Sequence, residues 1–332
     1  MGGGTVLVEA TVQGRIAVGN DINSLAVFLA RAKTRTYTDW DLERVGYWFS
    51  TMELRTGKRS RTLAKWLPYQ THLQSPDTWR IRKLIELALN DCSKLRDTNQ
   101  ELLARCIVLR TAQWALDCRR RIPSTDEFRS MLLHYANELL TGARQYAETL
   151  ALNCKLPRSE PICLHASAVG IHENPVWLSI PRPRLVLTSP PYPGVHVLYH
   201  RWQVKGRRET AAPYWIANSE DGASAMYYTF GDRENPEAYF RNAKHAYRSI
   251  AQVCDPSTIL VQMVAFAEPD RQLPRFLNML RASGFEEIDV EADDNADGRV
   301  WRSVPNRKWY ASQRGAIAAS KELVLFHRLT QK

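Results

Sequence analysis

The sequence predicts an α/β protein, a sheet with helices on both faces, carrying a mostly α-helical insertion. Short apolar runs that resemble buried strands alternate with amphipathic segments at the start of the chain and again after Pro161. Between them, residues from about 38 to 155 show helical periodicity with few strand signals. We therefore expect residues 1–34 and 160–332 to form the α/β domain and residues 35–159 to form the insertion.

Glycines and capping residues set the expected boundaries. A helix over 5–13 is expected to end at Gly14, a strand follows at 16–19, and Ser24 is placed to cap the next helix. The later strands are expected at 162–164, 185–188, 258–264 and 322–327, and the later helices at 236–253 and 274–283, the last ended by Gly284. Within the insertion, Thr98 with Glu101 and Ser124 with Glu127 have the spacing of capping boxes.

The bulk composition narrows the class of partner. The chain has 332 residues and a formal net charge of +10, a balance that suits a polyanionic ligand and equally a merely solvated basic surface. Its six cysteines include no Cys-x-x-Cys pair, which argues against a zinc site and a disulfide framework and favours reduced thiols in a cytoplasm. No apolar run reaches the length of a membrane span, and no secretory signal is present.

The most specific motif is Ser189-Pro190-Pro191-Tyr192, directly after the expected strand ending at Thr188. Ligands of α/β proteins bind at the carboxyl ends of parallel strands. A serine hydroxyl and a proline carbonyl can both accept hydrogen bonds from an amino group, and a tyrosine ring offers a stacking face for a base lifted out of a duplex. These groups suit methylation of an exocyclic amine, a poor nucleophile that must be held and aimed.

The motif resembles the catalytic Ser-Pro-Pro-Tyr of the S-adenosylmethionine-dependent N4-cytosine DNA methyltransferases, whose N6-adenine relatives usually carry Asp-Pro-Pro-Tyr. The resemblance implies a Rossmann-like methyltransferase sheet. It also implies that Ser189 and the Pro190 carbonyl hold the amino group and that Tyr192 stacks on the flipped base.

The start of the chain resembles the same family's cofactor motif. Gly2, Gly3, Gly4 and Thr5 precede the first expected helix, and Asp21 follows the next strand. A glycine loop lets backbone approach a cofactor, and an acid about 20 positions later is placed to bind ribose hydroxyls. By the resemblance these residues bind S-adenosylmethionine, and Ser167 lies where the family contacts the adenine ring, often with an acid. The alternatives are a cloning remnant or a floppy tail for the glycine-rich N-terminus, and an ordinary strand-end turn for Ser167.

Two basic–aromatic clusters are candidates for DNA contact, because cations neutralise phosphates and aromatics stack where a base has left. The first cluster follows the catalytic motif and the second lies near the C-terminus. Their proposed DNA-binding residues are Arg201, Trp202, Lys205, Arg207 and Arg208 in the first and Arg307 and Lys308 in the second, where Arg299, Trp301, Arg302, Trp309 and Tyr310 accompany them. Solvated faces with buried tryptophans are the alternative for both.

Together these features predict a site-specific DNA methyltransferase that is cytoplasmic and associated with the nucleoid, acting on duplex DNA beside a cognate restriction endonuclease. An N6-adenine or RNA amino-methyltransferase is one alternative. An inactive DNA-binding subunit, or half of a split methyltransferase, is the other. The insertion is either a recognition module or a structural lid.

The family's cofactor motif begins with a central strand leading into Asp-Pro-Phe, whereas this sequence opens with Met1 at the position before Gly2. The resemblance therefore implies that this strand comes from a longer reading frame or from another polypeptide. Without it, neighbouring strands would have unpaired backbone groups, so we expect residues 1–332 alone to be poorly soluble and to bind S-adenosylmethionine weakly or not at all.

Overall fold

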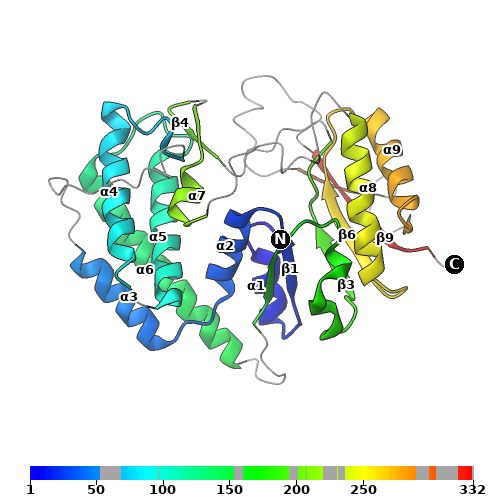
Figure 1. The fold of residues 1–332 in the computed structure, drawn as a ribbon, viewed down its shortest axis with the longest axis horizontal. Coiled ribbons are helices and arrows are strands. Elements are labelled where there is room, and N and C mark those ends of the chain that lie inside the picture. Colours follow the sequence, from blue (N-terminus) through cyan, green and yellow to red (C-terminus); the bar gives the residue numbers. More distant parts are fainter. Residues whose placement is uncertain are drawn as a thin grey trace. The chain divides into compact units, whose positions relative to one another are not determined.

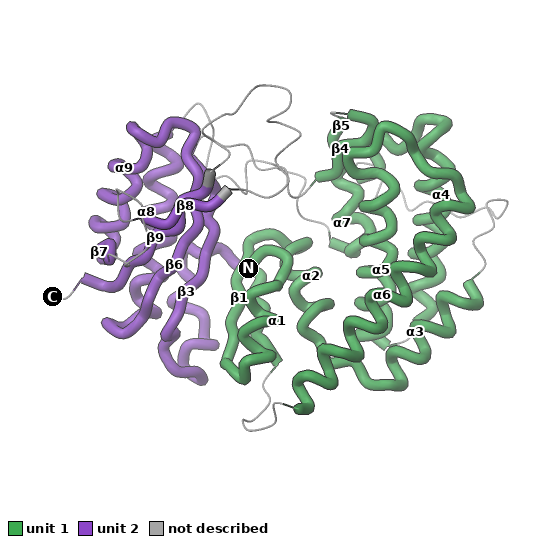
Figure 2. Tube along the Cα trace, turned by 180° about the vertical axis from the view of Figure 1, so that it is seen from behind, with its two compact units in different colours: residues 1–165, 198–224 green, residues 166–197, 225–332 purple. Residues whose placement is uncertain are grey.

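The structure is a computed structural model, and it describes residues 1–52, 69–95, 97–152, 160–193, 201–206, 208–219, 230, 236–288, 299–303 and 321–330. The chain forms two compact units (Figure 2). The first unit comprises Met1–His165 and Leu198–Ser224, and the second comprises Ala166–Val197 and Ala225–Lys332. Helices and strands occur in both, which confirms the α/β class (Figure 1).

The first unit combines a short parallel sheet with a large helical region. Its elements are α1 (Thr5–Val12), β1 (Val18–Asp21), α2 (Ser24–Thr34), α3 (Asp39–Thr51), α4 (Pro76–Cys92), α5 (Thr98–Leu116), α6 (Thr125–Leu152), β2 (Ile162–His165), β4 (Trp202–Val204), β5 (Arg208–Thr210) and α7 (Ala212–Ile216). Strands β1 and β2 pair in parallel, with Asp21 opposite His165. Strands β4 and β5 form an antiparallel hairpin.

One core joins the helical region to the rest of the first unit. Fully buried side chains from α3 to α6, among them Val45, Ile81 and Ile107, belong to the same apolar cluster as Phe28 of α2 and Trp202 of the hairpin. The predicted helical character of this region is confirmed by α3 to α6. Helix α2, which lies in the segment assigned by sequence to the α/β domain, packs with these helices in one unit.

The second unit contains a mixed sheet. Its elements are two short 3₁₀ helices, η2 (Ile171–Glu173) and η3 (Pro175–Leu178), β3 (Leu185–Thr188), α8 (Pro236–Val253), β6 (Ile259–Val264), α9 (Pro269–Arg281), β7 (Phe285–Glu287), β8 (Val300–Ser303) and β9 (Lys321–Leu329). The strand order is β3-β6-β9-β7, with β8 also paired to β9. Strands β3 and β6 are parallel, whereas β9 runs antiparallel to β6, β7 and β8.

Helices α8 and α9 cover one face of this sheet (Figures 1 and 2). Their aromatic side chains, including Tyr247 and Phe276, pack on Leu260 of β6 and Leu325 of β9. The edge of β3 away from β6 has no strand partner among the described residues, and neither has the edge of β1 away from β2. Two side chains of β3, Leu185 and Leu187, are about half exposed, which is unusual for a parallel strand.

Several expected boundaries need correction. Asn23, not Ser24, caps α2, because the buried Asn23 Oδ1 accepts from the backbone N–H of Leu25. Asp97, not Thr98, caps α5 in the same way, because its Oδ1 accepts from the backbone N–H groups of Asn99 and Gln100. The Ser124–Glu127 capping box is confirmed by its two reciprocal bonds of 3.1 and 2.7 Å.

Two further boundaries shift. The first strand is 18–21 rather than 16–19, because its parallel pairing with β2 begins at Val18. Helix α9 starts at Pro269, so Pro274 lies inside it instead of opening it. A proline at the first helical position has its φ already suited to a helix, which explains the earlier start.

Among the described residues, no helix combines the length and the apolar character needed to span a membrane.

A buried histidine gives the second unit a predictable pH dependence. His327 on β9 is 1% exposed, and burial lowers its pKa to about 4, with Glu287 opposing and Arg299 adding to the shift. The Gln262 Nε2 group lies 3.3 Å from His327 Nδ1, while Gln262 Oε1 accepts from the Tyr247 hydroxyl. The Nδ1 atom is therefore an acceptor, and the folded ring is neutral.

The stability that the neutral ring contributes is fully present above pH 6.5 and is lost as the pH falls toward 4. In that interval the unfolded chain binds a proton that the folded chain does not. The free energy of unfolding therefore falls by roughly 3 kcal/mol between pH 6.5 and 4. Chemical unfolding between pH 7.5 and 4 should show this slope in the parent and lose most of it in His327→Gln. His134→Gln, which changes an exposed histidine, is the control and should keep the parental slope. A parental slope in His327→Gln would contradict this account.

Candidate functional site

The glycine loop before α1 leaves open space beside its first two residues. Gly2 has a φ of +54°, and a Cβ built on it would meet nothing within 4 Å. A Cβ on Gly3 would meet only the end of the Lys33 side chain, at 3.6 Å. A ligand can therefore approach this backbone closely, which is what a cofactor loop requires.

Gly4 has a different, structural role. Its φ is +79°, and a Cβ there would lie 2.8 Å from the Ala30 Cα on α2. Only glycine allows α1 and α2 to pack this closely while the loop turns into α1.

Gly4→Ala should therefore lower the free energy of unfolding by at least about 1–2 kcal/mol, from left-handed strain and the clash together. Gly142→Ala is the matched control, because Gly142 lies within α6 with open space around its Cα. That change should raise stability by up to about 1 kcal/mol. Thermal unfolding measures both, and a neutral Gly4→Ala would show that the loop does not need a glycine.

Asp21 fixes this loop to the end of β1. Its Oδ2 accepts from the Gly2 N–H at 2.9 Å and from the Met1 ammonium at 3.1 Å, while its Oδ1 accepts from the Asn23 N–H at 3.0 Å. The carboxylate has about four acceptor positions, so these donors leave about one for a ligand hydroxyl. Sequence predicted that the glycine loop and Asp21 serve one site, and the structure brings Gly2 and Asp21 into direct contact.

Ser167 follows β2 by two residues, in an exposed turn. Its Oγ accepts from the Val169 N–H at 3.0 Å, so the hydroxyl proton remains able to donate. Before it, His165 Nε2 lies 3.2 Å from the Ile22 carbonyl and ties the end of β2 to the turn after β1. This geometry agrees with an ordinary strand-end turn. An additional ligand contact by Ser167 stays a prediction.

The Ser-Pro-Pro-Tyr loop leaves the carboxyl end of β3, the place expected for a ligand site. Ser189 is exposed, whereas Pro190 and Tyr192 are buried and Pro191 is half-buried. The Tyr239 hydroxyl donates to the Pro191 carbonyl at 2.7 Å and holds the loop against α8. Burial raises the pKa of Tyr239 well above its usual value, so this donor keeps its proton.

A chain of polar groups runs from the loop into the sheet. The Ser189 Oγ lies 3.1 Å from the Tyr192 hydroxyl, which donates to Glu322 Oε1 at 2.7 Å. Glu322 is 5% exposed, and its Oε2 lies 2.8 Å from the Nε of Arg302, its cross-strand partner on β8. The guanidinium compensates the charge of the buried carboxylate.

This chain fixes the direction of the Ser189 proton. A tyrosine hydroxyl has one proton, and that of Tyr192 is on the bond to Glu322, so Ser189 must donate to Tyr192. The lone pairs of the exposed Ser189 Oγ then remain for a ligand. The loop consequently presents a hydrogen-bond acceptor, which suits an amino group and disfavours a carbonyl.

The Tyr192 ring is placed differently from what base stacking needs. It is 8% exposed and belongs to the apolar cluster of Phe240 and Tyr247. Stacking on a base therefore requires the ring or the loop to move, and the Tyr192 hydroxyl has a positioning role in the conformation described. Sequence patterns missed Glu322 and Tyr239, because neither has a local signal that links it to the loop.

Only some of the expected DNA-binding residues are cations that are exposed in the structure. Trp202 is 5% exposed, inside the core of the first unit. Arg201 lies 3.8 Å from Glu209, Lys205 pairs with Asp77, and Arg208 is exposed. Arg207, Arg307 and Lys308 lie outside the described residues.

The nearby Arg299 and Arg302 are engaged in ion pairs of the second unit. Arg299 makes two bonds to Glu287, at 2.8 and 2.9 Å, and Arg302 pairs with Glu322. Glu287 in turn has its pKa lowered, chiefly by the bond from Arg299. These two arginines therefore form ion pairs with glutamates of the sheet.

The structure thus groups the predicted residues in two sets, Gly2 with Asp21 in the first unit and Ser189 with Tyr192 in the second. Within the described ranges, no three His, Cys, Asp or Glu side chains are grouped so as to hold a metal ion. No family model, curated protein or solved structure matches the chain.

Proposed function

We propose that this chain is an S-adenosylmethionine-dependent methyltransferase that acts on the exocyclic amino group of a DNA base, with cytosine N4 as the first candidate. One observation carries the proposal. At the carboxyl end of a parallel strand, Glu322 and Tyr192 orient the exposed Ser189 hydroxyl as an acceptor. A hydrogen-bond acceptor at this position suits an amine substrate, which has two N–H hydrogens to donate.

The residues divide the chemistry between them. Ser189 Oγ and the Pro190 carbonyl accept from the two amino hydrogens, which favours a pyramidal nitrogen whose lone pair is free to attack. When bound, S-adenosylmethionine supplies the methyl group on a sulfonium. The N–C bond forms as the S–C bond breaks, and the amine then loses one proton to solvent. Pro191, held by Tyr239, fixes the loop so that the attack is in line.

The open backbone of the glycine loop fits the cofactor. Gly2, Gly3 and Thr5 would lie along its amino-acid portion, Asp21 would accept from ribose hydroxyls, and Ser167 would contact the adenine. The open space at Gly2 and the remaining acceptor position of Asp21 support this assignment.

The sheet geometry also supports a Rossmann-like arrangement. Both parallel pairs, β1–β2 and β3–β6, carry proposed site residues at their carboxyl ends.

A non-catalytic DNA-binding subunit is the second candidate. It is favoured by the buried ring of Tyr192, which cannot stack on a base in the conformation described. Under this alternative the chain binds DNA without binding S-adenosylmethionine.

Transfer of a labelled methyl group from S-adenosylmethionine to duplex DNA, single-stranded DNA and RNA tests the proposal. The parent should label DNA, and Ser189→Ala should not. Ser179→Ala, which removes another exposed hydroxyl of the second unit, should behave as the parent. Labelling of RNA alone would reassign the substrate, and DNA binding without cofactor binding would establish the second candidate.

A further inference from the structure

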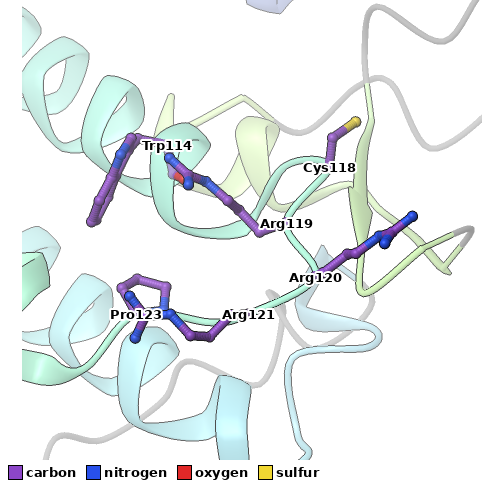
Figure 3. Close-up of a pocket in the computed structure, with 6 residues that line it drawn as sticks. All are labelled: Trp114, Cys118, Arg119, Arg120, Arg121 and Pro123. Carbon is purple, nitrogen blue, oxygen red and sulfur yellow. The ribbon is translucent and has the colours of Figure 1, made fainter. Parts of the chain in front are cut away.

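A pocket of about 330 Å³ lies at the end of α5 in the first unit (Figure 3). It is formed where the chain turns from α5 toward α6, and three consecutive arginines line it. The lining residues are Trp114, Cys118, Arg119, Arg120, Arg121 and Pro123. Neither the resemblance nor the candidate active site accounts for this pocket.

The turn that carries the three arginines (Arg119–Arg121, the arginine turn) is attached to the rest of the first unit by hydrogen bonds. The Cys118 N–H donates to the Gln203 carbonyl at 2.9 Å, and Asp117 Oδ1 accepts from the Gln203 N–H at 3.0 Å. These bonds attach the turn to the edge of β4, so that the turn and the β4–β5 hairpin form one surface. On the other side, the Arg119 Nε donates to the Trp114 carbonyl, and its guanidinium lies 5.1 Å from the centre of the Trp114 ring.

The charges of this surface are not balanced. Arg121 makes two bonds to Glu127, and Arg201 and Lys205 of the hairpin have acidic partners. Arg120 and Arg208 are exposed, and neither has an acidic partner in the part of the chain that the structure describes. Arg119 has a ring and a carbonyl as partners, and no carboxylate among the described residues pairs with it.

We propose that the arginine turn (Arg119–Arg121) and the β4–β5 hairpin together bind the phosphate backbone of DNA. A planar guanidinium matches a phosphate in a two-bond geometry, and here it is presented from a fixed turn. Cations on two joined elements suit a repeating polyanion better than a single phosphate. The exposed Arg119 guanidinium, lying over the partly buried Trp114 ring, adds a flat surface for a sugar or an unpaired base.

The inference rests on the proposed function for the choice of DNA, and it makes the helical region part of the DNA-binding surface instead of a lid. Its contacts are independent of cofactor and of base identity. They should therefore strengthen binding to every sequence and make it salt-dependent.

The test is the affinity of the whole chain for a duplex DNA, measured between 50 and 200 mM salt without S-adenosylmethionine. Arg120→Gln and Arg208→Gln should each weaken binding several-fold and should each lower the slope of log affinity against log salt by about 0.9. Arg44→Gln is the matched control, because Arg44 is also exposed and lies over Trp40. It is on α3, at the end of the first unit opposite the hairpin (Figures 1 and 2).

Parental slopes for Arg120→Gln and Arg208→Gln would overturn the inference, even if the chain methylates DNA. Reduced slopes in a parent protein that transfers no methyl group would support the inference while the proposed catalysis fails. A loss confined to duplex RNA, measured in parallel, would overturn the choice of DNA.

Discussion

Glu322→Gln should reduce methyl transfer by about 100-fold, the scale seen when one preorganised hydrogen bond is lost from an active site. Arg302 donates to one side-chain oxygen of residue 322, so the new amide should turn its oxygen toward Arg302 and its NH₂ toward Tyr192. Tyr192 would then accept from the amide and donate to Ser189. The Ser189 proton would point at the substrate amine, and two donors would face each other.

Tyr192→Phe provides the decisive comparison, because it keeps the ring in the core and removes only the hydroxyl. Ser189 is then free to rotate, so the loss should be smaller, about tenfold. The double variant should resemble Tyr192→Phe alone, since Glu322 can act on Ser189 only through Tyr192. Steady-state rates with saturating cofactor measure all three, and thermal unfolding checks the fold. Losses that multiply in the double variant would contradict the proton-orienting role.

Asp21→Asn should weaken binding of S-adenosylmethionine by about 10- to 100-fold, because bonds to a charged acceptor contribute about 1.5–3 kcal/mol. The change also removes an acceptor that holds the Gly2 N–H, so the glycine loop loses its fixed position. Affinity for DNA should not change. Calorimetric titration measures the cofactor, and Asp39→Asn, at an exposed carboxylate of α3, is the control. Parental cofactor affinity in Asp21→Asn would exclude the ribose-binding role.

Local sequence signals were sufficient for the elements that frame the candidate site. Strand β3 and helix α8 have the predicted bounds, because an uninterrupted apolar run and a proline at the first helical position are strong local markers. The contact of Gly2 with Asp21 could also be anticipated, since a loop before one helix and the end of the next strand meet at the same edge of a parallel sheet.

The remainder depends on contacts between distant residues. Tyr192 and Glu322 are 130 positions apart, and no periodicity in either segment links them. The pattern Arg201-Trp202 predicted an aromatic face for DNA, yet Trp202 pairs with Thr210 across the hairpin and packs into the helical core. An aromatic residue beside cations has the same sequence pattern whether its ring is exposed or buried.

The central claim is that Ser189 presents an acceptor to an exocyclic amine. The measurement that tests it most directly is mass analysis of the nucleosides from DNA methylated by this chain. The account predicts N4-methylcytosine, which is absent from DNA treated with Ser189→Ala. N6-methyladenine would agree with an exocyclic amine as the methyl acceptor but would change the target base from cytosine to adenine. Methylation at a ring carbon such as cytosine C5, or methylated nucleosides at the parental level from Ser189→Ala, would contradict the claim.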